Sequence, residues 1–527
     1  MPLQLRTQPA RMLASVHASW SASHGDSQTT RDIPRVQDWT RRRFLRVGGL
    51  GAAGLVFSAC TRVGTSHESA AADVVIVGAG IAGLRCASVL VQGGVVPHVF
   101  EAAARVGGRA RTLRGFFANG QETESGGEFI SSEHAAMRSL AASLNLDLER
   151  VDGGSHPGTD DVYWIDEAIY PLADLNNDWG TAYPRVQAAL RAAPWPQTFV
   201  SNTQAGRVLD DVPVPEWIDA EIEGGMAGRL GKVMYTAVTT EYGGEAADLP
   251  ALALIYLLGW NPRREIEIAG TDEAFHIVGG SDLVTTRMAE RLPADSVTLG
   301  AALEAVRDLG GGRYRCTFRS DASVFDVTTD HVVLALPFTK LREVDLDGTE
   351  ISEIKKRAIK ELGMGMSSKL HLQFSSKPWL DVNRSGFALT EGDSFQMVWD
   401  ETYTSTASSG ILVNYTGGNR SVERVTDFSG AAPSDLVTEM LQAIEPLFPG
   451  STTAFNGKAW RDHWIASPWH YGSYSYLRRG QHTGFSGIEP VPEGNLHFCG
   501  EHTSIEFRGF MEGAARSGSR AAREILG

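Results

Sequence analysis

The chain has few cysteines, no long hydrophobic run and an excess of negative charge, and each of these excludes a class of protein. Four cysteines in 527 residues are too few for a disulfide-built scaffold, and none stands in a CxxC or Cys/His spacing that would predict a metal site. The mildly apolar run at residues 47–59 is too short for a membrane span. A net charge of −15 argues against nucleic acid as a partner.

What remains is the composition of a soluble globular protein, with 42% hydrophobic and 21% charged residues. A length of 527 residues exceeds one ordinary domain, so two are expected. The first 40 residues are polar and lack periodicity, which predicts disorder. No internal repeat is present.

The most informative segment runs from Asp73 to Gly83 and has the order strand, glycine turn, helix. In a GxGxxG turn the first glycine permits the tight bend, the second lets the backbone approach a pyrophosphate, and the third lets the helix pack closely on the strand. A second apolar strand ends at Glu101, where a carboxylate can accept both ribose hydroxyls of an adenosine. These residues are predicted to bind a dinucleotide: Gly78, Ala79, Gly80, Ile81, Ala82, Gly83 and Glu101.

The residues directly after Glu101 distinguish a flavin from a nicotinamide nucleotide. They place two glycines beside two arginines, which suit a second arm against the phosphates because a planar guanidinium pairs with phosphate oxygens bidentately. A nicotinamide enzyme needs no such element here. In these residues the chain resembles the flavin amine oxidase family, which includes monoamine oxidases, polyamine oxidases and L-amino-acid oxidases. The predicted cofactor contacts of this arm are Ala102, Arg105, Gly108 and Arg109.

The resemblance implies an α/β fold, with a Rossmann-like FAD-binding domain of the glutathione-reductase type and a discontinuous α+β substrate domain. The apparent cofactor elements lie at 73–130, 265–340 and 455–527, and the ranges 131–264 and 341–454 are assigned to the substrate domain. Apolar periodicity in the substrate ranges predicts helices at 133–145, 351–362 and 435–448 and strands at 369–374 and 410–415.

The C-terminal segment resembles the family's closing motif, an apolar strand and Gly-Glu followed by an aromatic-Met-Glu-Gly-Ala helix start. The resemblance implies that Glu501 bonds the ribityl hydroxyls and that the N–H of Met511, at a helix N-terminus, faces the flavin's pyrimidine oxygen. It also implies that the backbone of Val306 meets the adenine, while the Val306 side chain belongs to the sheet core. The cofactor contacts predicted from this segment are Gly500, Glu501, Phe510 and Met511.

Four side chains are expected to act in the chemistry. Lys369 lies on the polar face of an alternating strand and resembles the family lysine that holds a water at flavin N5; a solvated face is the alternative. Trp464 matches a tryptophan near the flavin, nine residues before Ser473. Enzymes with covalent flavin carry cysteine where Ser473 stands, so FAD is predicted to be held non-covalently. Tyr474 and Phe510 match the two aromatics that flank the amine path to the flavin.

A further cofactor-side segment, made of Gly126, Gly127, Glu128 and Phe129, bears on the substrate. L-amino-acid oxidases of the snake-venom type carry an arginine here that binds the substrate carboxylate. This chain has Phe129 at that place, with Glu128 beside it. A carboxylate therefore loses an obvious partner, and a cationic amine gains one.

The chain is accordingly interpreted as an FAD-dependent amine oxidase, in which a neutral amine passes a hydride equivalent to the flavin. The imine then hydrolyses to an aldehyde or ketone plus ammonia, and oxygen is reduced to hydrogen peroxide. Three alternatives stay open: an L-amino-acid oxidase giving a 2-oxo acid, a related flavin dehydrogenase or desaturase, and a redox-inactive flavoprotein that serves as a binding module. A homodimer is one option for its assembly.

The heptapeptide Thr40-Arg-Arg-Arg-Phe-Leu-Arg46 resembles a twin-arginine export signal, and the apolar run after it resembles the core of a cleaved signal peptide. Residues 1–66 are therefore assigned to a disordered N-terminus and signal peptide. The sequence before Cys60 resembles a lipoprotein box, so either Cys60 bears a lipid or cleavage occurs nearby, for example after Ser66. The expected location is periplasmic, extracellular or, with the lipid, the cell surface.

Overall fold

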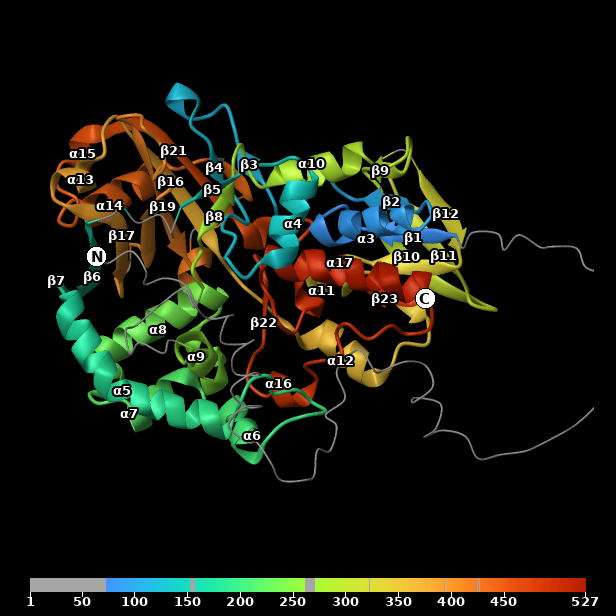
Figure 1. Cartoon of the computed structure of the whole chain (residues 1–527), viewed down its shortest axis with the longest axis horizontal. Helices are drawn as coiled ribbons and strands as arrows, with labels where there is room; N and C mark the ends of the chain where they lie inside the picture. Colours follow the sequence, from blue (N-terminus) through green and yellow to red (C-terminus); the bar gives the residue numbers. More distant parts are fainter. Residues whose placement is uncertain are drawn as a thin grey trace, which may run out of the picture. The chain divides into compact units, whose positions relative to one another are not determined.

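The computed structural model describes residues 73–527 except 152–155, 157, 261–270, 322, 393, 424 and 426 (Figure 1). The twin-arginine motif and Cys60 lie outside these residues, so export and lipidation stay predictions. The described part combines helices with parallel and antiparallel sheets, which confirms the predicted α/β class. No helix among the described residues is both long and apolar enough to cross a bilayer.

A parallel five-stranded sheet carries the predicted dinucleotide turn. Its central strand β1 is buried along its whole length because Val74 to Val77 are all apolar. Val74 and Ile76 share a core with helices α3 (Ile81–Gln92) and α17 (Met511–Leu526), which lie side by side (Figure 1). The strand order is β23 (Leu496–Phe498), β13 (His331–Leu334), β1 (Val74–Val77), β2 (His98–Glu101) and β9 (Val297–Leu299).

A four-stranded sheet covers the other face of β1. The side chains of Val75 and Val77 point to the face of β1 opposite Val74 and Ile76. They join a second core that contains Phe318 and Val306. The pairs of this sheet are antiparallel except β10 with β14, which is parallel. Its order is β12 (Val324–Thr329), β11 (Arg313–Arg319), β10 (Ala302–Gly310) and β14 (Asp345–Gly348).

A largely antiparallel eight-stranded sheet carries Lys369. Leu370, Leu372 and Phe374 pack with helix α14 (Ser434–Ile444), so the alternation of the strand turns Lys369 to the opposite face. Only β17 and β6 pair in parallel in this sheet, among the residues that the structure describes. The order is β20 (Ser429–Ala431), β21 (Phe455–His463), β16 (Ser368–Phe374), β19 (Gly410–Thr416), β18 (Met397–Asp400), β17 (Arg384–Thr390), β6 (Asp160–Ile165) and β7 (Ala168–Ile169).

A group of helices packs against the end of this sheet, through a core that includes Tyr163, Ile165 and Leu389 (Figure 1). Helix α9 is apolar and buried at every position, as expected for a helix that is hydrophobic all round. The group consists of α5 (Leu172–Ala192), α6 (Gln204–Asp211), α7 (Val214–Glu221), α8 (Arg229–Tyr242) and α9 (Ala251–Leu258).

The helices and strands expected from periodicity are confirmed, with ends shifted by a few residues. The predicted helices correspond to α4 (Ala135–Ser143), α12 (Glu353–Glu361) and α14, and the predicted strands to β16 and β19. The domain ranges stay a prediction. In the larger sheets, two strands cross the predicted ranges: β14 joins the four-stranded sheet of the cofactor side, and β21 joins the eight-stranded sheet.

Cys86, Cys316 and Cys499 are buried free thiols, and burial raises the pKa of each. Such thiols are inert packing groups rather than nucleophiles. Within the described ranges, no group of three or more His, Cys, Asp and Glu side chains is arranged to hold a metal ion.

Candidate active site

The turn between β1 and α3 forms a cradle for a phosphate group. Gly78 has a φ of +108°, and a Cβ there would lie 2.8 Å from the carbonyl oxygen of Ala335. A Cβ at Gly83 would lie 1.9 Å from the Gly78 carbonyl oxygen, so helix and turn are in direct contact. A Cβ at Gly80 would meet nothing within 4 Å, which leaves open space beside the helix start. Helix α3 has no acid in its first turn and no side-chain cap, so its N–H groups and dipole favour an anion.

Glu101 ends β2 and joins this turn to the next loop. Its Oε2 accepts the N–H of Ala79 at 2.7 Å, and its Oε1 accepts the N–H of Ala103 at 2.8 Å. Burial raises the pKa of Glu101, although these N–H groups and Arg105 oppose the rise. Each carboxyl oxygen keeps a further lone pair, so the predicted ribose contact is compatible with the bonds already made.

The glycine loop after β2 lies against the phosphate turn. Gly107 pairs in parallel with Gly80, and the Gly107 N–H donates to the Ala79 carbonyl at 2.9 Å. Arg105 donates to the carbonyls of Val106 and Gly108 at 2.9 and 2.7 Å, so it shapes its own loop. A guanidinium has five N–H donors, so the predicted phosphate contact of Arg105 would use those that these bonds leave free.

Arg109 and Glu501 form a junction between the front and rear glycine segments. Arg109 donates to Glu501 Oε1 at 2.7 Å and to the Ser473 carbonyl at 2.8 Å. Glu501 also accepts the N–H and hydroxyl of Ser475 at 3.2 and 2.7 Å and the N–H of Gly509 at 2.9 Å. Although burial opposes it, Arg109 and these donors lower the pKa of Glu501 to about 2. The predicted ribityl bond would compete with four donors for a carboxylate that has about four acceptor sites.

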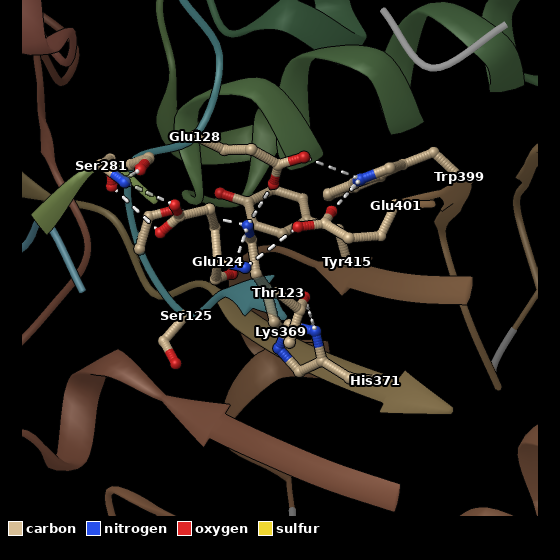
Figure 2. Close-up of polar contacts among 12 residues, drawn as sticks. Thr123, Glu124, Ser125, Glu128, Ser281, Lys369, His371, Trp399, Glu401 and Tyr415 are labelled. Carbon is tan, nitrogen blue, oxygen red and sulfur yellow. Dashed lines mark hydrogen bonds and ion pairs between the residues drawn. The ribbon is translucent and has the colours of Figure 1, made fainter. Parts of the chain in front are cut away.

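Lys369 lies in a polar group, the Lys369 cluster, whose buried members are Lys369, Glu124 and Glu128 and whose half-buried member is Glu401 (Figure 2). Its ammonium donates to the Glu124 carbonyl at 2.8 Å, to the Gly126 carbonyl at 3.3 Å and to Glu128 Oε2 at 2.7 Å. These acceptors account for all three donors of an ammonium. Burial alone would lower the pKa of Lys369, but the charges of Glu128 and Glu401 raise it. The solvated alternative is thereby wrong, and the predicted water at flavin N5 would share the longest of the three bonds.

Glu128 is engaged by the protein, which corrects its predicted role as a partner for a cationic amine. Oε2 accepts from Lys369, and Oε1 accepts the indole N–H of Trp399 at 3.3 Å. The reason is non-local, because β16 and β18 bring Lys369 and Trp399 to a glutamate that precedes both by more than 200 residues. Phe129, its neighbour, lies 6.1 Å from the Trp399 ring, centroid to centroid.

Two side chains from the C-terminal half, Trp464 and Met511, pack against the glycine segment 126–127. The Trp464 indole donates to the Ser125 carbonyl at 2.7 Å, and its ring lies 3.0 Å from a Cβ placed on Gly126. The side chain of Met511 lies 3.1 Å from a Cβ placed on Gly127. The segment 126–127 therefore has room only for glycine between these side chains.

Tyr474, one of the two predicted substrate aromatics, lies beside the residue that precedes the other, Phe510. A Cβ on Gly509, the residue before Phe510, would lie 3.6 Å from the ring of Tyr474. The Tyr474 hydroxyl lies 2.7 Å from that of Tyr415 and donates to the Glu241 carbonyl at 2.6 Å, which fixes the ring. The Phe510 ring lies 5.2 Å from the ring of His134, centroid to centroid.

The other predicted cofactor positions have the surroundings that a flavin nucleotide needs. The Val306 side chain is fully buried in the core, which leaves only its main chain for a ligand, as predicted. Phe510 caps α17 without a side-chain bond, so the helix start at Met511 offers backbone donors. With the open space at Gly80, these positions can hold FAD.

Sequence reasoning missed Glu124, Glu401, Trp399 and Tyr415. Glu124 ends the short strand β4 (Thr123–Glu124), two residues before the predicted segment that begins at Gly126, and this nearness is the signal that was present. Glu401, which accepts the Glu124 N–H at 3.0 Å, follows β18 in a stretch without any recognisable pattern. Only strand pairing brings it to the site.

Comparisons with known proteins agree with this geometry. The profile of the family described as "Flavin containing amine oxidoreductase" matches residues 81–526. Amine oxidase [flavin-containing] A of Canis lupus familiaris is 24% identical over 88% of this chain and 87% of its own length. Lysine-specific histone demethylase 1 homolog 1 of Arabidopsis thaliana is 26% identical over 86% of this chain, which spans only 52% of that protein.

Solved structures show the same fold. Cyclohexylamine oxidase from Brevibacterium oxydans has a TM-score of 0.74 at 21% identity and covers 86% of this chain and 99% of its own. Putrescine oxidase bound to putrescine has a TM-score of 0.73 at 21% identity, with coverage of 86% and 99%. The chain belongs to the flavin-containing amine oxidoreductase family, with a Rossmann-like FAD-binding fold and FAD as its cofactor. It is an FAD-dependent amine oxidase.

Proposed function

We propose that the protein oxidises a neutral amine without a carboxylate to an imine, and reduces oxygen to hydrogen peroxide. The imine hydrolyses to an aldehyde or ketone and ammonia. FAD, when bound, accepts the hydride equivalent from the carbon next to the amine nitrogen. The absence of cysteine at Ser473 supports FAD held without a covalent bond.

The observation that carries the substrate class is the side of the site formed by Glu128 and Phe129. Phe129 packs near Trp399 and offers no charge, and the Glu128 carboxyl is bonded to Lys369 and Trp399. Lys369, the cation beside Glu128, already gives its donors to Glu128 and to two backbone carbonyls, so it is not free to bind a substrate carboxylate. An isolated carboxylate would be costly to desolvate there, whereas a neutral amine is not.

The chain's own groups hold the aromatic pair in place and keep it uncharged. Burial raises the pKa of the Tyr474 hydroxyl well above its usual value, with Tyr415 and Glu241 adding to the rise. Burial also lowers the pKa of His134 to about 3, so the ring behind Phe510 is neutral at working pH. Both side chains are therefore uncharged at neutral pH, which suits a neutral amine between Tyr474 and Phe510.

A peroxide-coupled screen of primary amines and L-amino acids, with the FAD-loaded protein, tests the proposal. Amines are expected to release peroxide and ammonia in equal amounts and to bleach the flavin under anaerobic conditions. Turnover of amino acids alone, or bleaching without aerobic recovery, would contradict it. Phe129→Arg should move the preference toward carboxylate-bearing substrates, and Phe129→Leu is the matched control. Acid precipitation should release the flavin into the supernatant.

We also propose export by the twin-arginine route, supported by the heptapeptide at residues 40–46. Replacing Arg41 and Arg42 with lysine should keep the protein in the cytoplasm, as seen by cell fractionation. Cys60→Ser should release it from membranes if Cys60 bears a lipid, and should leave its location unchanged if cleavage lies elsewhere. A homodimer remains a prediction that light scattering can decide.

A further inference from the structure

The Lys369 cluster contains more acids than bases. The cluster has three carboxyl groups and a single ammonium; the exposed fraction of Lys369 is 6%, those of Glu124 and Glu128 are each 7%, and Glu401 is half-buried. If all four groups were charged, the cluster would carry two excess negative charges. Unpaired buried charge costs several kcal/mol, so such groups retain protons instead.

Burial raises the pKa of Glu124 to about 8, and the contacts of its carboxyl group are compatible with a proton there. The hydroxyl of Ser281 has one hydrogen and two acceptors within reach, the Gly127 carbonyl at 2.7 Å and Glu124 Oε2 at 3.0 Å. The shorter contact takes the hydroxyl hydrogen to Gly127. The Ser281 contact can then be made by a hydrogen on the Glu124 carboxyl group, while the Thr112 hydroxyl, 3.1 Å from each Glu124 oxygen, supplies a further donor. The Ser281 N–H meanwhile donates to Glu124 Oε1 at 2.7 Å.

A second shortage of donors occurs between Glu128 and Glu401. The single indole N–H of Trp399 faces both, at 3.3 Å from Glu128 Oε1 and 3.1 Å from Glu401 Oε2 (Figure 2). One hydrogen cannot satisfy two carboxylate oxygens that also repel each other. A proton between the two carboxyl groups removes both the repulsion and the shortage.

We infer that Glu128 and Glu401 share one proton and act together as positioning residues that hold the Lys369 ammonium at the flavin site. This inference rests on the proposed function only for the place of Lys369 at the flavin. The proton shared by Glu128 and Glu401 depends only on the chain's own groups. Glu128 bonds the ammonium directly, while Glu401 is anchored by the Glu124 N–H and by Trp399.

The other charged and titratable groups around Lys369 leave this assignment intact. Burial and the Glu401 charge raise the pKa of Glu128 well above its usual value, whereas Lys369 lowers that of Glu401 against the effect of burial. One member of the pair therefore keeps the proton and the other keeps the charge. Further titratable groups near the cluster are Tyr415 on β19, His371 on β16 and, beside His371, Asp462 on β21.

Infrared spectroscopy tests the shared proton, because the C=O stretch of a protonated carboxyl group is separate from the carboxylate bands. At neutral pH, Glu401→Gln and Glu128→Gln should each remove one protonated-carboxyl band from the spectrum. Both variants should lose the band, because the one glutamate that remains is ionised and is balanced by the Lys369 ammonium. Glu304→Gln, which alters an exposed pair with Arg319, should remove none and is the matched control.

Retention of every protonated-carboxyl band in both variants would overturn the inference. If one variant does not fold, the other still decides, because each alone must lose the band. Trp399→Phe gives an independent check: it keeps both carboxyl groups, so the band should persist, shifted by the loss of the indole donor. None of these readings depends on turnover, so failure of the proposed amine oxidation would be seen separately.

The positioning role has its own test in the visible spectrum of bound FAD. Lys369→Met and Glu128→Gln should shift the flavin absorption in the same direction. The double variant should shift it no further than Lys369→Met alone, because Glu128 acts through Lys369. Additive shifts would show that Glu128 acts on the flavin by another path and would refute the role assigned to it.

Discussion

Replacing Glu501 with glutamine is expected to weaken the junction that Arg109 and Glu501 form between the front and rear glycine segments. The carboxylate accepts from Arg109, Ser475 and Gly509, and an amide nitrogen in place of one oxygen would face donors instead of accepting from them. A pKa of about 2 against an ordinary 4.5 corresponds to about 3 kcal/mol of stabilisation at neutral pH. We expect Glu501→Gln to lose about this much free energy of unfolding.

The contribution of Glu501 to the free energy of unfolding is expected to depend on pH. Because the folded pKa of Glu501 is lowered, its contribution is present above pH 4.5 and is lost as the pH falls toward 2. Urea unfolding should therefore show a constant difference between wild type and Glu501→Gln from pH 5 to 8, narrowing at lower pH. Glu304→Gln should change stability by about 1 kcal/mol at most, since that pair is exposed. A loss this small for Glu501→Gln would refute the reasoning.

Two further predictions concern the glycine turn and Glu124. Gly80→Ala should leave the unfolding temperature of the FAD-free protein unchanged, because a Cβ there meets nothing and the backbone is extended, but should weaken FAD binding by about tenfold or more in a fluorescence titration. Gly83→Ala should destabilise the FAD-free protein by about 1–3 kcal/mol through its clash with Gly78, and the reverse ranking would contradict the cradle. Burial raises the pKa of Glu124 to about 8, so the protonated carboxyl favours folding below pH 4.5 and this contribution is lost as the pH rises through 8. Glu124→Gln, which mimics the protonated acid, should gain stability over wild type between pH 6 and 9 in urea unfolding, and a pH-independent difference would show that Glu124 is already ionised.

The local parts of this site could be predicted from the sequence because neighbouring residues determine them. The order of strand, turn and helix at Gly78 to Gly83 follows from residues in direct succession, and Glu101 ends the strand that pairs with β1. Lys369 could be placed on a polar face by alternation alone. Its partners could not, because Glu128 and Glu401 lie far from it in the chain and meet it only through the pairing of β16, β19 and β18.

The arginines of the loop after β2 show the other limit of sequence reasoning. The second arm against the phosphates stays a prediction, although the Gly80–Gly107 bridge lays its loop against the phosphate turn. The sequence does not reveal which acceptors the two guanidinium groups bond. Arg105 bonds its own loop and Arg109 bonds Glu501, because carbonyls and a carboxylate made available by folding satisfy these donors inside the protein.

The order in which the strands of the five-stranded sheet leave the ribosome has a consequence for loading the cofactor. Strand β1, which bears the phosphate turn, is made first, while its sheet is completed at the edge by β23, which is made after β13, β2 and β9. Glu501 and the start of α17 follow β23 directly. A growing chain therefore presents half of a nucleotide site for most of its synthesis, and FAD has its full set of contacts only after translation has passed Met511.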